Sequence, residues 1–119
     1  MLIIDDNEAI LHVLGRILTK QGYNVETART GNEALEKLSE RSFQLAIIDL
    51  DLPDMNGFEL HKIIGTRSPA TKRIILTGLP PKRDLEHDSI QEPLRILMKP
   101  LTGEELVSAV KKALDSDAT

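Results

Sequence analysis

Strand-like segments alternate with helical patterns along the whole chain, and this alternation restricts the fold more than any other feature of the sequence. Five apolar, β-prone segments begin roughly 21 to 28 residues apart, about the length of one βα unit. These segments are Leu2–Ile4, Tyr23–Ala28, Leu45–Ile48, Arg73–Leu76 and Arg95–Met98. Three of them are almost continuously apolar, which is typical of strands that are buried on both faces.

Capping residues mark the helices between these segments. The expected N-caps are Asn7, Thr30, Asn56 and Thr102. Two of them are threonines that open capping boxes, because a glutamate follows three residues later. The first helix is expected over residues 8–21, with Gly22 just past its end.

Residues 79–94 break the pattern, because this segment holds three prolines and few apolar residues. Pro93 must end any helix here, and Pro81 suits the first position of a short one. We predict a short, poorly anchored helix or a loop, with above-average mobility.

Alternating βα units build a parallel sheet with right-handed crossovers and helices on both faces. We therefore predict the α/β class, as a flavodoxin-like doubly wound (βα)5 fold. Its five-stranded parallel sheet has the order 2-1-3-4-5, and its fourth helix is atypical. The 119 residues make one domain over residues 1–115, and the polar tail 116–119 suits the start of a linker.

The composition excludes several classes of function. The formal net charge is −4, which argues against nucleic-acid binding by this domain itself. There is no cysteine, so neither a disulfide framework nor a thiolate zinc site is expected. No apolar run approaches the roughly 18 residues of a membrane span, and the first residues do not resemble a signal peptide. We expect a cytoplasmic setting without membrane association.

Polar residues follow the predicted strands at their carboxyl ends. Asp5 and Asp6 follow the first strand, Asp49 the third, Thr77 the fourth and Lys99 the fifth. Because the carboxyl ends of parallel strands share one edge of the sheet, these five side chains should meet there. The three aspartates belong to strands 1 and 3, between which the predicted strand order reverses.

Three carboxylates this close repel one another, and a bound divalent cation relieves the repulsion. Mg²⁺ suits them best, because it prefers hard oxygen ligands and keeps several waters. An ionised aspartate is also a nucleophile that can form an aspartyl phosphate. Phosphoryl transfer needs positioning and charge neutralisation, which Lys99 and the hydroxyl of Thr77 can supply. The pattern predicts a magnesium-assisted phospho-acceptor site.

This set of residues resembles the receiver domain of two-component response regulators, and the resemblance covers essentially the whole chain. Asp5-Asp6 matches the acidic pair of that family, and Asp49-x-x-Leu52-Pro53-x-x-Asn56-Gly57 matches its acceptor loop. Thr77-Gly78 matches its switch hydroxyl and the small residue that follows it. Lys99-Pro100 matches its lysine, which usually precedes a cis-proline bond.

The resemblance implies that Asp49 accepts a phosphoryl group from a phosphohistidine on a sensor histidine kinase or phosphotransfer protein. It implies that Asp6 binds Mg²⁺ directly, Asp5 mainly through water, and Asp51 through its backbone carbonyl. Thr77 and Lys99 would hold the phosphoryl group, and their movement would shift the face around strands 4 and 5. An attached or separate output partner would read this change.

The resemblance also implies that the domain catalyses its own phosphorylation and dephosphorylation, and that a homodimer can form through the face around strands 4 and 5. Two features depart from the family pattern. Ile96 stands three residues before the lysine, where the family usually has an aromatic residue that swaps rotamers. The proline-rich segment 79–94 stands where the family has its fourth helix, part of the usual output face.

Two other functions compete with this one. The first is a receiver-like module that binds proteins without being phosphorylated, which a lack of Mg²⁺ binding would favour. The second is a haloacid-dehalogenase-type phosphatase, because Ile47-Ile48-Asp49-Leu50-Asp51 resembles its hydrophobic-DxD start. Against the phosphatase, Leu52-Pro53 follow where a small residue and threonine are expected, and the acidic pair Asp5-Asp6 comes first instead of late.

The remaining polar residues are expected to be less important. We expect Asp54 to be a loop residue with a solvated charge. The side chain of Asp51 is hypothesised to border the phosphoryl site, where it would alter Mg²⁺ affinity or orient a hydrolytic water. The histidines at positions 12, 61 and 87 are expected at the surface, so zinc is not expected.

Overall fold

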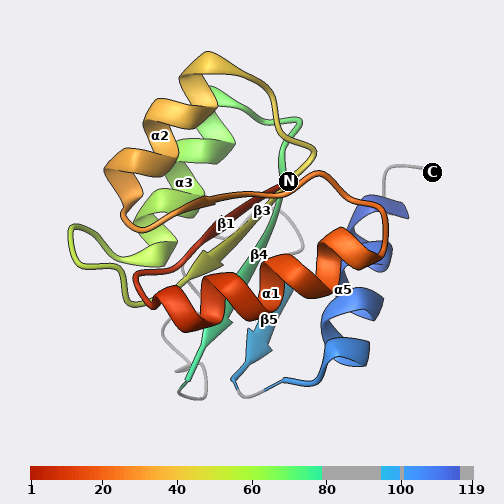
Figure 1. Cartoon of the computed structure of the whole chain (residues 1–119). Coiled ribbons are helices and arrows are strands. Elements are labelled where there is room, and N and C mark those ends of the chain that lie inside the picture. The colour runs from red at the N-terminus through yellow and green to blue at the C-terminus, as the bar shows by residue number, and fades with distance from the viewer. Residues whose placement is uncertain (79–94, 100, 116–119) are drawn as a thin grey trace.

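The computed structural model describes residues 1–78, 95–99 and 101–115, and it shows strands and helices in alternation (Figure 1). The strands are β1 (Leu2–Ile4), β2 (Glu26–Ala28), β3 (Leu45–Asp49), β4 (Lys72–Thr77) and β5 (Arg95–Met98). The helices are α1 (Glu8–Lys20), α2 (Gly31–Glu40), α3 (Gly57–Arg67) and α5 (Gly103–Asp115). The predictions for residues 79–94, for Pro100 and for the tail 116–119 concern residues outside those described.

The five strands form one parallel sheet in the order β2-β1-β3-β4-β5. This is the predicted order, so the doubly wound α/β class is confirmed. Helices α1 and α5 pack on one face of the sheet, and α2 and α3 pack on the other (Figure 1). Successive strands are added toward one side of the sheet up to β2 and toward the other side from β3 onward. The parallel strands β1 and β3 are therefore neighbours at this switch point, and their carboxyl ends lie side by side.

Alternation along β3 divides the core into two clusters. All five residues of β3 are buried. Leu45 and Ile47 contact the cluster beneath α1 and α5, whereas Ala46 and Ile48 contact the cluster beneath α2 and α3. Burying apolar side chains on both faces contributes about 25 cal/mol per Å² of apolar surface, so β3 anchors the residue at its end firmly.

The predicted caps are present. The side chain of Asn7 accepts hydrogen bonds from the backbone N–H groups of Ala9 and Ile10, and Asn56 accepts one from Phe58. Gly22 has a φ of +94°, the left-handed conformation expected just after a helix. These contacts fix the entry of α1 and α3, and both helices begin next to the carboxyl edge of the sheet.

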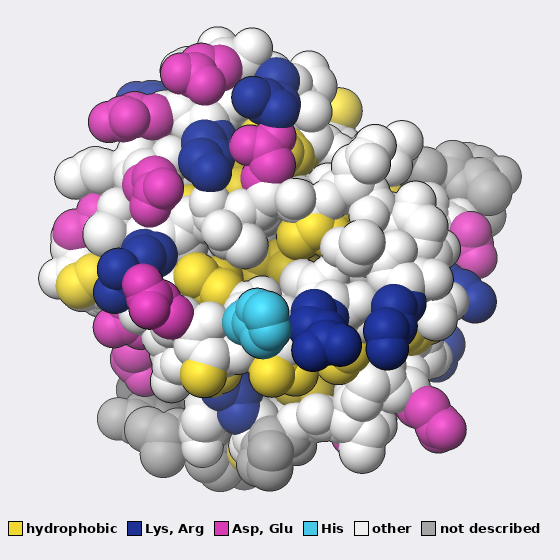
Figure 2. All heavy atoms as spheres, in the orientation of Figure 1, with side chains coloured by type: hydrophobic (Ala, Val, Ile, Leu, Met, Phe, Trp, Pro, Cys, Tyr) yellow, Lys and Arg dark blue, Asp and Glu magenta, His cyan; other side chains and the backbone are white. Residues whose placement is uncertain are grey.

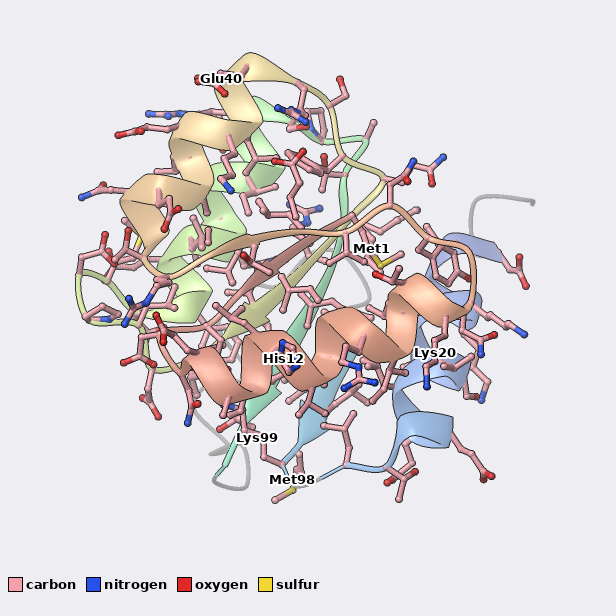
Figure 3. The ribbon with its side chains drawn as sticks, in the orientation of Figure 1. Met1, His12, Lys20, Glu40, Met98 and Lys99 are labelled. Atoms are coloured by element: carbon pink, nitrogen blue, oxygen red, sulfur yellow. The ribbon has the colours of Figure 1, made fainter. Side chains whose placement is uncertain are left out.

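Two expectations are corrected by the structure. The second strand covers Glu26–Ala28 only, because its pairing with β1 starts where Leu2 meets Glu26, and Tyr23 lies outside this ladder. His61 is not a surface residue, since only 8% of it is exposed. It lies on the stripe of α3 that also buries Leu60 and Ile64 against the sheet. His12 is exposed, as expected (Figure 3), and His87 lies outside the described residues.

The part of the chain that the structure describes contains no helix long and apolar enough to cross a membrane. The face over α1 and α2 is mixed in charge (Figure 2). Lys and Arg side chains lie beside the histidine on α1, and acidic side chains gather toward α2. A face of this kind offers no continuous basic surface to a nucleic-acid backbone.

Candidate functional site

Three carboxylates meet at the carboxyl edge of the sheet. Asp5 follows β1 directly, Asp6 comes next, and Asp49 is the last residue of β3. One carboxylate oxygen from each lies within 4.8 Å of the others. Asp5 and Asp49 are buried, with 1% and 5% of their surface exposed, while Asp6 is exposed. The structure therefore brings together the acidic residues that the strand ends predict.

Lys99 lies directly after β5, at the same edge of the sheet (Figure 3). Its Nζ donates to Oδ1 of Asp49 at 2.9 Å and to Oδ2 of Asp5 at 3.0 Å. The other oxygen of Asp5 accepts from the backbone N–H of Asn7 at 2.9 Å. One ammonium group thus compensates for two buried carboxylates, and Asp5 is held from both sides.

The environment shifts the pKa of both partners. Burial raises the pKa of Asp49, the hydrogen bond from Lys99 opposes this, and the negative charges of Asp5 and Asp51 add to the rise. Burial alone would lower the pKa of Lys99, but its hydrogen bonds and its attraction to Asp49 and Asp5 outweigh burial and raise that pKa. The acidic cluster therefore needs positive charge, and Lys99 is held firmly as a cation.

Thr77 is the last residue of β4 and is buried. It is paired in register with Met98, and its backbone carbonyl accepts from the N–H of Lys99 at 2.7 Å. The ends of β4 and β5 are thus joined where Thr77 and Lys99 lie. Ile96 is half-buried and packs against the cluster beneath α2 and α3.

The loop 50–56 after Asp49 is closely packed. The N–H of Leu50 donates to the carbonyl of Leu76 at 2.9 Å, and the N–H of Gly57 donates to the carbonyl of Leu50 at 2.8 Å. A Cβ on Gly57 would lie 2.5 Å from the carbonyl oxygen of Asp49 and 2.7 Å from the Cα of Leu50. Only glycine fits this close approach, so Gly57 keeps the backbone of Asp49 in place.

Asp54 has a structural role that differs from the expected one. It is exposed, but its carboxylate accepts from the N–H groups of Gly31 and Asn32, both at 2.8 Å. Desolvation acts to raise the pKa of Asp54, but these two hydrogen bonds hold it below the ordinary value. Sequence reasoning missed this contact because it joins residues 22 and 23 positions apart. No local sequence pattern signals this contact.

The donor set fits Mg²⁺. Three carboxylates supply only hard oxygen atoms, and the exposure of Asp6 leaves room for the waters that Mg²⁺ keeps. Neither His12 nor His61 belongs to this cluster, so among the described residues the site lacks the nitrogen ligands typical of zinc. A bound dication would also offset the burial that raises the pKa of Asp49.

Comparison with known proteins identifies this architecture. Residues 1–111 match the family model of the response regulator receiver domain. The chain belongs to that family. It is 34% identical over 118 residues to the transcriptional regulatory protein GlrR of Escherichia coli K12, covering 99% of this chain and 27% of that protein. It is 30% identical to the response regulator receiver protein CpdR of Brucella abortus, covering 96% of this chain and 95% of that protein.

Solved receiver domains have the same fold. A CheY-like receiver domain protein from Methanospirillum hungatei superimposes with a TM-score of 0.88 at 36% identity, over 97% of this chain and 92% of that chain. The response regulator TrrA from Thermotoga maritima, solved in complex with Mg²⁺ and BeF, gives 0.83 at 31% identity, over 95% of this chain and 96% of that chain. This receiver domain spans about a quarter of the length of GlrR-type relatives. The family assignment decides against the phosphatase.

Proposed function

We propose that Asp49 is the phosphoryl acceptor of a Mg²⁺-dependent two-component phosphorelay. One observation supports this most directly. The Asp49 carboxylate lies at the end of the central strand, within reach of two further carboxylates and 2.9 Å from the ammonium of Lys99. The proximity of these groups supports the proposal, because phosphoryl transfer requires a nucleophile, a bound cation and a further positive charge at one point.

The proposed metal ligands are the carboxylates of Asp6 and Asp49 and the backbone carbonyl of Asp51, with Asp5 acting mainly through water. When bound, Mg²⁺ supplies positive charge that offsets the charge on the transferring phosphoryl oxygens. Asp5 keeps a second function, because one of its oxygens already accepts from Lys99. It therefore couples the position of Lys99 to the metal site.

In the proposed reaction an Asp49 carboxylate oxygen attacks the phosphorus of a phosphohistidine. A P–O bond forms on Asp49, the N–P bond to the imidazole breaks, and the imidazole leaves with the bonding electron pair. Lys99 turns from the Asp49 carboxylate to a phosphoryl oxygen while keeping Asp5, and the hydroxyl of Thr77 donates to another. Hydrolysis by water returns Asp49 to a free carboxylate, and the same residues assist both steps.

The proposed donor is a sensor histidine kinase or a phosphotransfer protein, and the reader is an attached or separate output partner. Relatives of both lengths support an output partner that is either attached or separate, since this chain spans 27% of GlrR but 95% of CpdR. The proposal takes residues 1–115 as the receiver unit and residues 116–119 as the start of a linker. It places the exchange in the cytoplasm and allows a homodimer through the face around β4 and β5.

Intact-mass measurement after incubation with acetyl phosphate tests the acceptor. The wild type, Asp49→Asn and Glu104→Gln are compared with and without Mg²⁺. Glu104 is an exposed carboxylate on α5 and serves as the matched control. We expect one phosphoryl adduct that needs Mg²⁺, persists in Glu104→Gln and disappears in Asp49→Asn.

If no adduct forms, the experiment is repeated with a histidine-phosphorylated phosphotransfer domain as the donor, since some receivers react poorly with small donors. Failure with both donors would contradict the proposed acceptor. It would leave the receiver-like binding module that is not phosphorylated. An adduct that survives in Asp49→Asn would place the acceptor on another residue.

A further inference from the structure

The loop that follows Asp49 is attached to the start of α2 by a side chain that the proposed chemistry does not use. Oδ1 of Asp54 accepts from the N–H of Gly31, and Oδ2 accepts from the N–H of Asn32, each at 2.8 Å. Both N–H groups belong to the first turn of α2 and have no partner within the helix. The carboxylate therefore binds α2 with both oxygens, and the positive end of the helix dipole strengthens the contact.

The next residue in the loop adds an apolar contact to the same helix end. A Cβ placed on Gly31 would lie 2.6 Å from Sδ of Met55 and 2.7 Å from its Cγ. The thioether thus fills the space that a side chain at position 31 would take. Met55 is half-buried and packs against the cluster beneath α2 and α3. In Figure 1 the loop before α3 lies beside the lower end of α2.

The other end of the loop belongs to the acidic site. Asp51 forms an isolated antiparallel bridge with Asn56, and the N–H of Gly57 donates to the carbonyl of Leu50. The loop is therefore closed on itself next to Asp49 and fastened to α2 at its tip. A displacement of the tip would change the backbone at Asp51, because only two residues separate Asp51 from Asp54.

We propose that Asp54 is a positioning residue that fastens loop 50–56 to α2 and so holds the Asp51 carbonyl where it binds Mg²⁺. This inference rests on the proposed function for the identity of the metal. The contact itself joins the side chain of Asp54 to two backbone N–H groups of α2 and includes none of the proposed metal ligands. Its effect on the ion is exerted through the backbone of the loop.

An ordinary helix cap is the competing explanation, and α2 already has one. Thr30 accepts from the N–H of Glu33 at 3.0 Å, and the carboxylate of Glu33 accepts from the N–H of Arg29 at 2.8 Å. This capping box caps the N-terminus of α2 without help from the loop. Thr30 and Asp54 thus cap the same helix end, but only Asp54 belongs to loop 50–56.

This difference gives a matched pair of variants, Asp54→Ala and Thr30→Ala. Mg²⁺ affinity is measured by calorimetric titration of the full chain, and thermal unfolding reports the loss of stability. We expect Asp54→Ala to weaken Mg²⁺ binding about tenfold, as loss of a group that supports a metal ligand typically does. Asp54→Ala and Thr30→Ala should lower the thermal midpoint by similar amounts. Thr30→Ala, however, should leave the Mg²⁺ affinity within about twofold of the wild type.

Amide hydrogen exchange in the metal-free protein tests the fastening alone. The N–H of Gly57 should exchange faster in Asp54→Ala and at the wild-type rate in Thr30→Ala. Asp54→Asn keeps one strong acceptor oxygen and should recover part of both the affinity and the protection.

Equal weakening of Mg²⁺ binding in the two alanine variants would overturn the inference and reduce Asp54 to a second cap. An unchanged exchange rate of the Gly57 N–H in Asp54→Ala would show that Asp54 does not hold loop 50–56 in place. A wild type that binds no Mg²⁺ would contradict the proposed function and, with it, the metal half of this inference. The exchange result would still decide whether Asp54 holds the loop.

Discussion

The ammonium nitrogen of Lys99 lies 2.9 Å from Oδ1 of Asp49, and this bond joins the end of β5 to the end of β3. The same nitrogen reaches Asp5 at 3.0 Å. The side chains of the two aspartates are almost fully buried, whereas about a quarter of the Lys99 side chain is exposed. A single cation that solvent reaches therefore keeps two buried carboxylates compatible with the fold, and it lies where a metal ion would add further positive charge.

We predict that Lys99→Met destabilises the metal-free protein at neutral pH. The methionine keeps much of the apolar stem but removes the charge, which leaves Asp5 and Asp49 to repel each other. Breaking a fully buried pair costs several kcal/mol, and the partial exposure of Lys99 reduces this to about 1–2 kcal/mol. Urea unfolding measures the change, and saturating Mg²⁺ should stabilise this variant more than the wild type.

The control for Lys99→Met is Lys62→Met, which removes an exposed charge on α3. This change should alter stability by less than about 0.5 kcal/mol. Because the folded pKa of Lys99 lies above its ordinary value of 10.5, its contribution is complete below that value and is lost as the pH rises through the folded pKa. Equal stability of Lys99→Met and the wild type at pH 7 would contradict the prediction.

The contributions of Asp49 and Asp54 to stability should depend on pH in opposite directions. The pKa of Asp49 is raised above 3.8, mainly by burial, so its ionised form costs stability at neutral pH and this cost disappears as the pH falls. Metal-free Asp49→Asn should therefore be more stable than the wild type at pH 7, and the gain should shrink toward about pH 4. Urea unfolding at pH 7 and toward about pH 4 measures the difference in stability between the variant and the wild type.

Asp54→Asn should change stability in the direction opposite to Asp49→Asn. The pKa of Asp54 is lowered below 3.8, so its contribution to stability is present above that value and is lost as the pH falls through the folded pKa. The variant should be less stable than the wild type at pH 7, and the difference should close in acid. Parallel pH profiles for the two variants would show that their environments do not differ as described.

The sequence predicts the edge cluster because it depends on local rules that act together. Polar residues end or directly follow β1, β3, β4 and β5. Parallel strands share one carboxyl edge, and the caps at Asn7 and Asn56 fix where the following helices start. These rules require no knowledge of side-chain packing. They account for the strand order and for the approach of Asp5, Asp49 and Lys99.

The features that sequence reasoning missed depend on contacts between distant segments. The bond from Asp54 to Gly31 requires the relative position of a loop and a helix, which no local pattern encodes. His61 is polar, but its place on α3 puts it next to buried Leu60, and its carbonyl accepts from Arg73 at 3.2 Å. The length of β2 depends on where β1 begins. Tertiary contacts determine each of these features.

We predict that Asp51→Asn weakens Mg²⁺ binding about threefold, because it removes an exposed negative charge close enough to contribute to the raised pKa of Asp49. The effect should diminish at high ionic strength, as expected for a solvated charge. Calorimetric titration measures the affinity, and loss of the phosphoryl adduct over time measures its lifetime. If both quantities match the wild type, the side chain of Asp51 has no part in the site.

Gly57→Ala should damage both stability and the acceptor. The added Cβ would lie 2.5 Å from the carbonyl oxygen of Asp49 and 2.7 Å from the Cα of Leu50, and these backbone atoms have no cheap way to move. We expect a loss of about 2–3 kcal/mol in urea unfolding, since overpacking of this kind forces the backbone to shift. The rate of phosphorylation by acetyl phosphate should fall about tenfold, because the nucleophile is displaced.

Gly15→Ala is the matched control for this substitution. It lies within α1, and its added Cβ would meet Val25 at an ordinary 3.8 Å. Alanine favours a helix interior over glycine by about 0.5–1 kcal/mol, so this variant should be more stable than the wild type and phosphorylated at the same rate. If Gly57→Ala also gained stability, loop 50–56 would have room for a side chain, and the close approach at Asp49 would not constrain the site.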